Sequence, residues 1–534
     1  MKKLVLVLVI CCFFLATYVE GEYWNQFRGP NGDGKSDAQN LPIQFTESQN
    51  VRWKTPIHDQ GWSSPVVWGN QVWLTTARED GIELFAVCID LENGKVVHDI
   101  KVFNVAEPQS EYPDLNSHAS PTPVVEEGRI YVHFGTYGTA CLDTQTGKKL
   151  WERRDLNCDH RVRPASSPII DDGLLFLVFD GVDVQFIAAL EKESGQTRWL
   201  EKRQVNNDLA QVLAAGGVKD IEKTLKEKPN DNRKSYATPT IVEHNGQKQL
   251  ISPAAEATFS YVPQTGEELW QVRHQDWGWN VACRPIYDNG LVFFSTGVTK
   301  TLLAVDPSGQ GDITETHVVW SHRRGSPEIP SPLVHNDLIF FTNEGGVVSC
   351  LESKTGNEVW KGRVGGNHWA SPILAGERIY FFNQEGEISV ISASREFQLL
   401  AENELNASFI ASPAVVEDTM ILRSTTDLYY LANGFERVVS KDEASPRRKV
   451  KKEGKGKRQG KNDDQGSKSR GKIKSRKGQA SVRQQVEGWT NYFRTASEQQ
   501  IRQAIESEKF QDLPEEVKKE IGIAAKKYLS KKGE

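Results

Sequence analysis

The sequence predicts an all-β fold, an eight-bladed β-propeller built from four-stranded antiparallel blades. The first observation is a pattern that recurs eight times, a small residue or a close substitute followed by proline and a short hydrophobic run. The second is its spacing, because self-similarity with a period of roughly 40–50 residues indicates a propeller, a solenoid or an array. The recurring prolines lie 40 to 71 residues apart and are Pro65, Pro123, Pro168, Pro239, Pro285, Pro332, Pro372 and Pro413.

Each repeat is expected to fold into one blade. In the best-preserved repeat, from Pro123 to Trp151, four short apolar or alternating runs are separated by turns that contain Gly128, Gly135 and Gly147. This pattern is typical of a four-stranded antiparallel meander. Glycine supplies the positive φ angle that tight hairpin turns require.

The final repeat stops early, at residues 428–431, and lacks an outer strand. Residues 50–54, near the other end of the chain, carry Trp53 at the spacing of a last-strand tryptophan but have no preceding strands of their own. We expect this segment to pair with the final blade and close the ring, which leaves few open sheet edges. The propeller is therefore predicted to span residues 50–434.

Most repeats carry a tryptophan in the fourth run, close to a turn glycine. A tryptophan side chain buries about 150–250 Å², so it is expected to fill the wedge between neighbouring blades and to have a structural role. The predicted blade-docking residues are Trp53, Trp151, Trp199, Trp270, Trp320 and Trp360.

Two stretches of the sequence resemble a known family. The run Asp143-x-x-Thr146-Gly147-x-x-x-Trp151 and its echoes resemble the tryptophan-docking motif of the pyrroloquinoline-quinone (PQQ) type propeller repeat. That family includes quinoprotein alcohol dehydrogenases and the BamB-type propeller proteins of outer-membrane barrel assembly, and the resemblance covers roughly residues 50 to 432. The segment from Trp24 to Gly34 is similar to the start of secreted bacterial members. The resemblance implies the fold, whereas function depends on sites grafted onto it.

Residues 1–21 are typical of an export signal. Lys2 and Lys3 precede an unbroken apolar run over residues 4–16, and a cut before Glu22 fits the pattern. The alternative is an uncleaved anchor, although the run is shorter than the ~20 residues of a usual membrane span. The protein is therefore expected in the periplasm or at the cell surface, with membrane association as the alternative.

Five cysteines remain after the signal. Cys88, Cys141 and Cys350 occupy one repeat position, where other blades have alanine, so they are expected to be small buried hydrophobic residues. An odd number leaves at least one thiol unpaired within the chain. The sequence does not decide whether Cys158 and Cys283 form a disulfide bridge.

Four segments lie outside the repeats and the export signal. Residues 22–49 form an N-terminal extension, and residues about 205–234 form an insertion with the periodicity of two short helices. The insertion is either a lid or partner contact, or a decorated loop. Residues 486–534 are expected to form a small helical segment with a capping box at residues 497–500.

The remaining segment, residues 435–485, is predicted to be a basic disordered linker. Within it, residues 441–485 hold seventeen Lys or Arg against five Asp or Glu, which gives about +12 in a chain of net charge −6. Such a composition cannot bury a core. The linker is either a solvated tether or a binder of polyanions or anionic lipid. The export signal and the lack of interleaved aromatic residues argue against a specific nucleic-acid role.

Propellers usually bind ligands at one mouth of the central channel. Residues five positions before each repeat proline are mostly polar, with aromatic residues close by, and equivalent points of eight blades converge on one rim. Such a ring suits a ligand or partner, and a hydrated rim without a ligand is the alternative. We expect alanine at His118, Arg163 and Trp369 to leave the fold stable. The candidate rim residues are Trp62, His118, Arg163, Tyr236, Trp279, Asn280, Arg284, His368 and Trp369.

Catalytic signatures are weak. A PQQ- and calcium-dependent dehydrogenase needs carboxylate and amide oxygens for the cation and an Asp base, and the resemblance implies a vicinal disulfide in catalytic members. The only adjacent cysteines, Cys11 and Cys12, lie in the export signal, although Asp276 and Glu328 lie close to the rim series. The sequence therefore favours a non-catalytic binding or scaffold propeller without a cofactor, acting on envelope proteins or peptides in cell-envelope or outer-membrane protein assembly. The alternatives are a PQQ- and calcium-dependent dehydrogenase of alcohols or sugars, and a surface carbohydrate-binding protein.

Overall fold

The computed structural model divides the chain into two compact units, residues 1–450 and 451–534. The predicted export signal, nearly all of the basic linker and nearly all of the C-terminal helical segment lie outside the described residues. None of the helices in the described part of the chain has the length and hydropathy that a membrane crossing requires. The described residues are 23–109, 115–204, 209–215, 220–227, 229–274 and 278–439, with Lys518 and Ile521.

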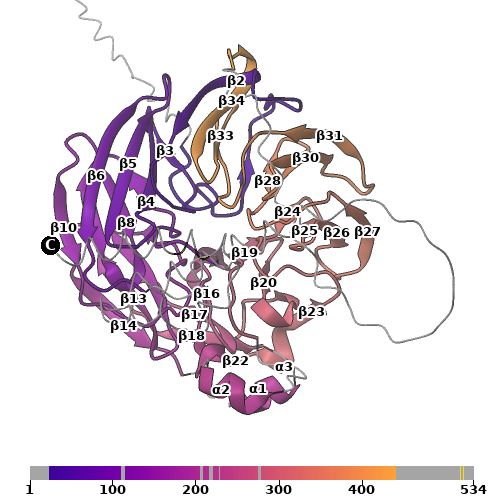
Figure 1. Cartoon of the computed structure of the whole chain (residues 1–534). Helices are drawn as coiled ribbons and strands as arrows, with labels where there is room; N and C mark the ends of the chain where they lie inside the picture. The colour runs from indigo at the N-terminus through magenta and orange to yellow at the C-terminus, as the bar shows by residue number, and fades with distance from the viewer. Residues whose placement is uncertain are drawn as a thin grey trace, which may run out of the picture. The chain divides into compact units, whose positions relative to one another are not determined.

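The first unit contains eight antiparallel sheets arranged in a ring, which confirms the predicted propeller (Figure 1). Each repeat proline directly precedes the innermost strand of a blade. Blades 1 and 2 contain β3 (Val66–Trp68), β4 (Gln71–Ala77), β5 (Glu83–Asp90), β6 (Val96–Asn104), β7 (Val124–Glu126), β8 (Arg129–His133), β9 (Thr139–Asp143) and β10 (Lys149–Arg153). Blades 3 and 4 contain β11 (Ile169–Asp171), β12 (Leu174–Asp180), β13 (Gln185–Glu191), β14 (Thr197–Lys202), β15 (Thr240–His244), β16 (Gln247–Pro253), β17 (Ala257–Tyr261) and β18 (Glu268–Arg273).

The second half of the ring repeats this plan. Blades 5 and 6 contain β19 (Ile286–Asp288), β20 (Leu291–Ser295), β21 (Leu302–Val305), β23 (Val318–His322), β24 (Leu333–His335), β25 (Leu338–Thr342), β26 (Val347–Glu352) and β27 (Glu358–Arg363). Blades 7 and 8 contain β28 (Ile373–Ala375), β29 (Arg378–Phe382), β30 (Glu387–Ser392), β31 (Leu399–Glu404), β32 (Ala414–Val416), β33 (Thr419–Arg423) and β34 (Asp427–Glu436).

The ring closes between the two ends of the propeller sequence. Strand β2 (Gln49–Pro56) pairs antiparallel with β34 and becomes the outer strand of blade 8, with Trp53 opposite Tyr430. In Figure 1 this closure is visible where the indigo β2 lies beside the orange β34. The predicted closure by residues 50–54 is therefore confirmed.

Short elements decorate the ring. The helices α1 (Leu209–Ala215) and α2 (Ile221–Glu227), followed by the 3₁₀ turn η2 (Asp231–Arg233), lie between blades 3 and 4, where the periodicity indicated two short helices. The long third turn of blade 5 contains β22 (Gly311–Asp312), which pairs with β18, and α3 (Thr314–His317). Two further 3₁₀ turns are η1 (Gly135–Tyr137) and η3 (Gly297–Thr299).

The repeat tryptophans connect neighbouring blades. Five of the six donate the indole N–H to a backbone carbonyl in the third turn of the following blade, each at 2.9 Å. Trp270 differs, because it donates to the side-chain oxygen of Gln249 at 2.8 Å, and the amide nitrogen of Gln249 then donates to the carbonyl of Pro307 at 2.9 Å. The long turn of blade 5 is thus reached through a glutamine. The five direct pairs are Trp53–Leu91, Trp151–Lys192, Trp199–Pro263, Trp320–Ser353 and Trp360–Ser394.

The residue before each repeat proline explains why that position is small. At six of the eight positions its backbone N–H donates to the hydroxyl of the equivalent residue in the next blade, at 2.9 to 3.0 Å. A buried N–H needs such a partner, so the hydroxyls join successive blades around the channel. Arg284 occupies the one position of the eight without a hydroxyl or other small side chain. The accepting residues, called here the hydroxyl ring, are Thr122, Ser167, Thr238, Ser331, Ser371 and Ser412.

Residues 24–36, called here the channel segment, run along the innermost strands. Trp24 pairs with Val67 of blade 1, and the carbonyl of Asn25 accepts a hydrogen bond from Val125 of blade 2. Strand β1 (Lys35–Ser36) pairs parallel with β28 on its channel side. The channel segment therefore uses the free edges of the innermost strands of blades 1, 2 and 7.

Two buried arginines hold the channel segment. Arg28 donates to the carbonyls of Pro332 and Pro372 in blades 6 and 7, at 2.7 and 3.3 Å. From blade 5, Arg284 donates to the carbonyl of Phe27 and, at 3.1 Å, to the side-chain oxygen of Gln26. The sequence alone gave the N-terminal extension no role, because these contacts join residues about 250 to 350 positions apart.

The cysteines are all buried free thiols in the described residues. The bridge left open between Cys158 and Cys283 is absent, because Cys158 lies beside His160 at 3.5 Å while Cys283 donates to the carbonyl of Pro330 at 3.3 Å. Cys141 lies opposite Trp151 in the adjacent strand. The thiols therefore pack as small hydrophobic side chains.

A substitution at Gly32 tests whether the channel segment packs against Arg284. Its φ is +68°, and a Cβ atom there would overlap the guanidinium of Arg284. We predict that Gly32→Ala lowers the free energy of unfolding by about 2–4 kcal/mol, from backbone strain and displacement of Arg284. Denaturant unfolding measures the loss.

Gly290→Ala is the matched control for this substitution. Gly290 has a φ of +79° with no atom in the way of a Cβ. The Gly290→Ala variant should therefore lose only the unfolding free energy that backbone strain costs, about 1–2 kcal/mol. Equal losses for the two variants would mean that the channel segment does not pack against Arg284.

Candidate functional site

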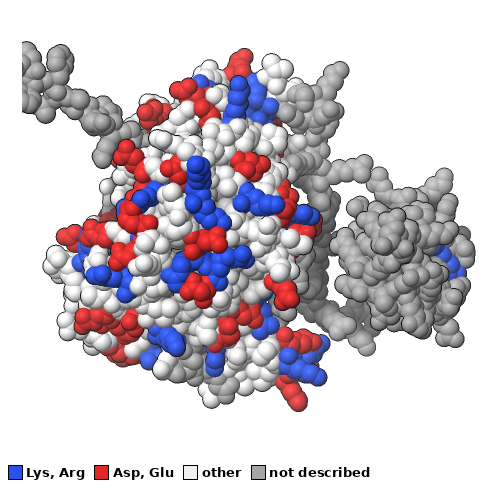
Figure 2. Space-filling view, turned by 90° about the vertical axis from the view of Figure 1, so that its left-hand side faces the viewer, with Lys and Arg blue, Asp and Glu red and all other residues white. Residues whose placement is uncertain are grey.

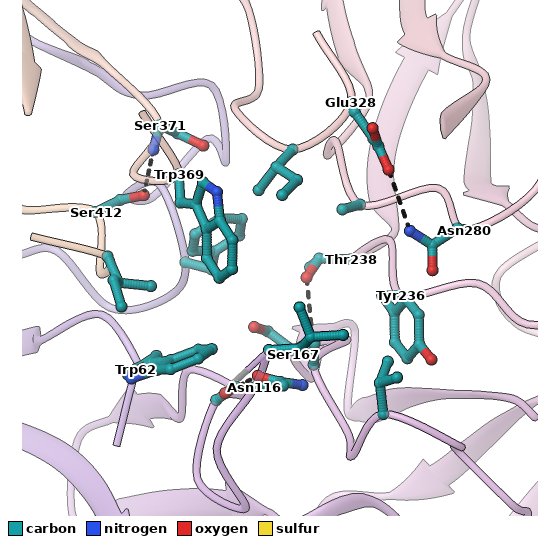
Figure 3. A pocket seen from close by; sticks show the side chains of 18 of the residues that line it. Trp62, Asn116, Ser167, Tyr236, Thr238, Asn280, Glu328, Trp369, Ser371 and Ser412 are labelled. Carbon is teal, nitrogen blue, oxygen red and sulfur yellow. Dashed lines mark hydrogen bonds between the residues drawn. The ribbon is translucent and has the colours of Figure 1, made fainter. Parts of the chain in front are cut away.

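The loops that lead into the innermost strands enclose a cavity of about 560 Å³ at one mouth of the channel, called here the mouth cavity. Phe27 of the channel segment is among the residues that line it. Residues three positions before the repeat prolines line the cavity in all eight blades, which makes the site a product of the whole ring (Figure 3). These residues are Trp62, Ser120, Ala165, Tyr236, Ala282, Ile329, Trp369 and Ile410.

Aromatic rings form much of the wall. Trp62 and Trp369, from blades 1 and 7, meet edge to face with ring centroids 5.9 Å apart and an interplanar angle of 73°. Both are partly exposed in the cavity, as Figure 3 shows. Tyr236 is buried and its hydroxyl donates to the carbonyl of His160 at 2.6 Å. The ammonium of Lys234 lies 4.6 Å from the centroid of the Trp279 ring, a cation–π contact that fixes both side chains.

Charged side chains of the wall are paired with one another. Lys300 lies between two carboxylates, with its Nζ atom 3.2 Å from Glu328 and 2.7 Å from Glu344. Glu344 also accepts the backbone N–H groups of Glu328 and Ile329 at 2.7 and 3.1 Å. Asn280 donates to Glu328 at 3.4 Å (Figure 3). This network fixes the loop between blades 5 and 6.

The insertion contributes to the same cavity. Asp231 of η2 and Lys234 line it, and the two side chains form an ion pair. Helices α1 and α2 precede this pair in the chain. The insertion is therefore connected directly to one wall of the mouth cavity.

Five of the nine candidate rim residues line the mouth cavity: Trp62, Tyr236, Trp279, Asn280 and Trp369.

The other four candidate rim residues are buried and support the loops. His118 bonds through Nε2 to the carbonyl of Gln109 at 2.9 Å, and His368 bonds to that of Gly365 at 2.6 Å. Arg163 donates to the carbonyl of Asn116 at 2.7 Å.

Arg284 lies deeper, against the channel segment.

His118 and Arg163 are only 2% exposed, so alanine at either removes a buried polar contact and should destabilise the fold. For these two residues the structure therefore favours the opposite prediction to the one made from the sequence.

The backbone register explains why four of the nine candidate rim residues do not line the cavity. Alternate side chains of an extended segment share one face, so positions one and three before the proline face the channel. Farther back the chain turns, and Arg163 and Asn280 have φ values of +70° and +58°. Counting three residues back from each proline would have found the lining.

The residues do not fit calcium-bound PQQ, which the family resemblance implies. Calcium takes six to eight oxygen ligands. Two carboxylates of the mouth cavity, Glu328 and Glu344, already share the ammonium of Lys300, which lies where a cation would bind. Among the described residues no group of three or more His, Cys, Asp or Glu could hold a metal ion.

The outer surface contrasts with the cavity. Figure 2, which views the side of the propeller that lies on the left in Figure 1, shows acidic and basic side chains interspersed. Lys101 pairs with Glu83 at 2.8 Å and Lys192 with Glu126 at 2.7 Å. The described residues of this face form no large region of a single sign, of the type that binds nucleic acid.

A family model described as outer membrane protein assembly factor BamB matches residues 53–214 and 258–437, more than half of the chain. No curated protein matches the sequence.

Three solved structures resemble the fold. BamB from Moraxella catarrhalis is 12% identical, with 71% of this chain and 99% of that chain covered and a TM-score of 0.49. A europium-containing methanol dehydrogenase is 11% identical, with 78% and 90% covered and a TM-score of 0.56. Quinohemoprotein alcohol dehydrogenase from Comamonas testosteroni is 10% identical, with 80% and 82% covered and a TM-score of 0.56. At these identities the likeness to the two dehydrogenases shows the fold alone.

Acid should destabilise the propeller. Burial lowers the pKa of His133 to about 3 and the pKa values of His160 and His274 to about 4. The unfolded chain therefore binds protons below pH 6.5 that the folded chain does not. We predict that the free energy of unfolding falls as the pH is lowered from 6.5 to about 4, by up to about 1.4 kcal/mol per pH unit for each of the three histidines. Asp180, whose pKa burial raises to about 6, has a smaller effect of opposite sign.

Denaturant unfolding at pH 7 and pH 5 measures this slope. In His133→Gln, one titrating ring is removed, so the slope should decrease. An unchanged slope in this variant would show that His133 is not the buried neutral group described here.

A second prediction concerns the quinone. Titrating PQQ with Ca²⁺ into residues 22–534 should give neither saturable quenching of tryptophan fluorescence nor a calcium-dependent rise in Tm, because Lys300 occupies the carboxylate pair. A saturable response that requires calcium would contradict this description of the mouth cavity.

Proposed function

The chain belongs to the family of outer membrane protein assembly factor BamB, and from this premise we propose that it is an exported, non-catalytic binding propeller of the cell envelope. Its mouth cavity would receive a segment of a partner envelope protein. The family description supports a role in envelope protein assembly, and the cavity supplies the binding site that such a role needs.

One observation carries the proposal: the channel segment reaches the mouth cavity, from which we infer that the cavity is a cup closed at its inner end. The channel segment fills the channel behind it, and Phe27 is among the residues that line the cavity. The rings of Trp62 and Trp369 are partly exposed within it. Pre-formed aromatic cavities with a few polar groups suit a ligand that inserts.

The character of the wall favours a peptide as the ligand. Apolar side chains contributed by several blades line the cavity in addition to the tryptophans. A sugar would leave these aliphatic groups without a partner, whereas a peptide with an apolar side chain would bury them. The aliphatic lining residues are Leu115, Val162, Val298, Ile329 and Ile410.

Site-specific cross-linking tests the proposal. A photo-reactive residue replaces Leu115, which is 50% exposed at the cavity, in the full chain expressed with its export signal. We predict a discrete cross-linked envelope protein, and we predict that Trp62→Ala combined with Trp369→Ala removes it.

Val319 provides the matched control, because it is 49% exposed but lies on the outer strand β23. The same replacement there should give no such adduct. Equal adducts at both positions, or adducts that persist in the double variant, would contradict binding at the mouth cavity.

A further inference from the structure

The hydroxyl ring presents unused hydrogen-bond donors to the mouth cavity. Each hydroxyl oxygen already accepts a backbone N–H from the preceding blade. Among the described residues none of these hydroxyls donates its own proton. A serine or threonine hydroxyl can donate one hydrogen bond, so five O–H groups are available to a ligand. The members that line the cavity are Thr122, Ser167, Thr238, Ser371 and Ser412.

Three buried arginines around the channel carry positive charge, and the carboxylate of Asp33 attracts two of them, Arg28 and Arg284. Arg28 and Arg284 bond to carbonyl and amide oxygens of the channel segment and the inner loops. Arg423 donates to Ser63 and to the carbonyl of Thr75, at 2.6 to 2.9 Å. None of the three forms an ion pair within the described residues, and burial lowers the pKa of each, to about 10, 9 and 9 in that order.

Acidic residues of the mouth cavity do not cancel this charge. Asp231 is paired with Lys234, and Lys300 serves both Glu328 and Glu344. The acidic lining residues thus leave one excess negative charge at the wall, and Asp33 adds a second, against three guanidinium groups. Buried charges are normally paired. The three arginines do not themselves line the mouth cavity, so they favour an anion at its inner end through longer-range attraction.

We propose that the inner end of the mouth cavity binds the C-terminal carboxylate of the partner's segment, with the last apolar side chain against Trp62 and Trp369. The hydroxyl ring donates to the carboxylate oxygens, and the buried arginines supply the charge. A chain end fits a closed cup, whereas an internal segment must both enter and leave. This inference rests on the proposed function and specifies its ligand.

Three peptides distinguish a C-terminal carboxylate from a side-chain carboxylate as the group that binds. The probes are Ala-Ala-Phe with a free carboxylate, the same peptide as its C-terminal amide, and a doubly blocked Ala-Asp-Phe whose only carboxylate is a side chain. Binding to residues 22–534 is followed by tryptophan fluorescence. We predict that the free acid binds at least about tenfold more tightly than either blocked peptide, as expected for hydrogen bonds to a charged group.

Two serine variants separate ligand binding from folding. Ser371 and Ser331 each accept one backbone N–H from the preceding blade, at 3.0 and 2.9 Å, but only Ser371 lines the cavity. Ser371→Ala and Ser331→Ala should therefore lower Tm by similar amounts. Only Ser371→Ala should weaken binding of the free acid, by about tenfold.

The outcomes distinguish this inference from the proposed function. Equal binding of acid and amide would overturn the carboxylate assignment and leave peptide binding intact. Preference for the Asp side chain, or no binding of any probe, would also overturn it. Equal weakening by Ser331→Ala would show that the hydroxyls act through the fold. The cross-linking at Leu115 is independent of all these results.

Discussion

Filling of the central channel is the constraint on which the rest of the structure depends. A ring of eight blades surrounds its axis with the free edges of innermost strands, whose backbone groups need partners. Here the channel segment provides partners in blades 1, 2 and 7, from Trp24 against Val67 to β1 against β28. The same stretch of chain then continues to β2, which closes blade 8. One N-terminal extension thus fills the channel and joins the ends of the ring.

This filling also determines the chemistry of the mouth. Because Phe27 of the channel segment lines the mouth cavity, we infer that the site is a cup and not a passage. Arg284 links the two features, since its backbone donates to Ser331 of the hydroxyl ring and its side chain holds the channel segment. The other seven blades have Ser or Thr at the position of Arg284. The arginine therefore interrupts the hydrogen bonds that hydroxyls form between blades, but it anchors the channel segment. The cavity is therefore positioned by the same contacts that stabilise the propeller.

The fold was predictable because its signals are local and repeated. Each repeat proline precedes an innermost strand, and Trp53 lies on the strand that closes the ring. The candidate site was predictable only in part. Trp62, Tyr236 and Trp369 line the cavity because their register relative to the proline places them on the channel face, whereas His118 and His368 are buried under the loops.

The role of the channel segment could not be read from sequence. Its contacts join residues far apart in the chain, such as Arg28 with Pro332 and Pro372, and no periodic pattern marks them. The carboxylate pairing of Lys300 was hidden for the same reason, because Glu328 and Glu344 approach it only after blades 5 and 6 have packed. Long-range polar contacts of this kind carry no local signal.

Hydrogen exchange of the intact chain tests the central claim most directly. If the channel segment fills the channel, the amides of residues 24–36 exchange as slowly as those of the innermost strands, because both are closed by the same hydrogen bonds. Exchange of residues 24–36 at the rate of an unstructured peptide, while the blades remain protected, would contradict a closed channel and with it the cup-shaped site.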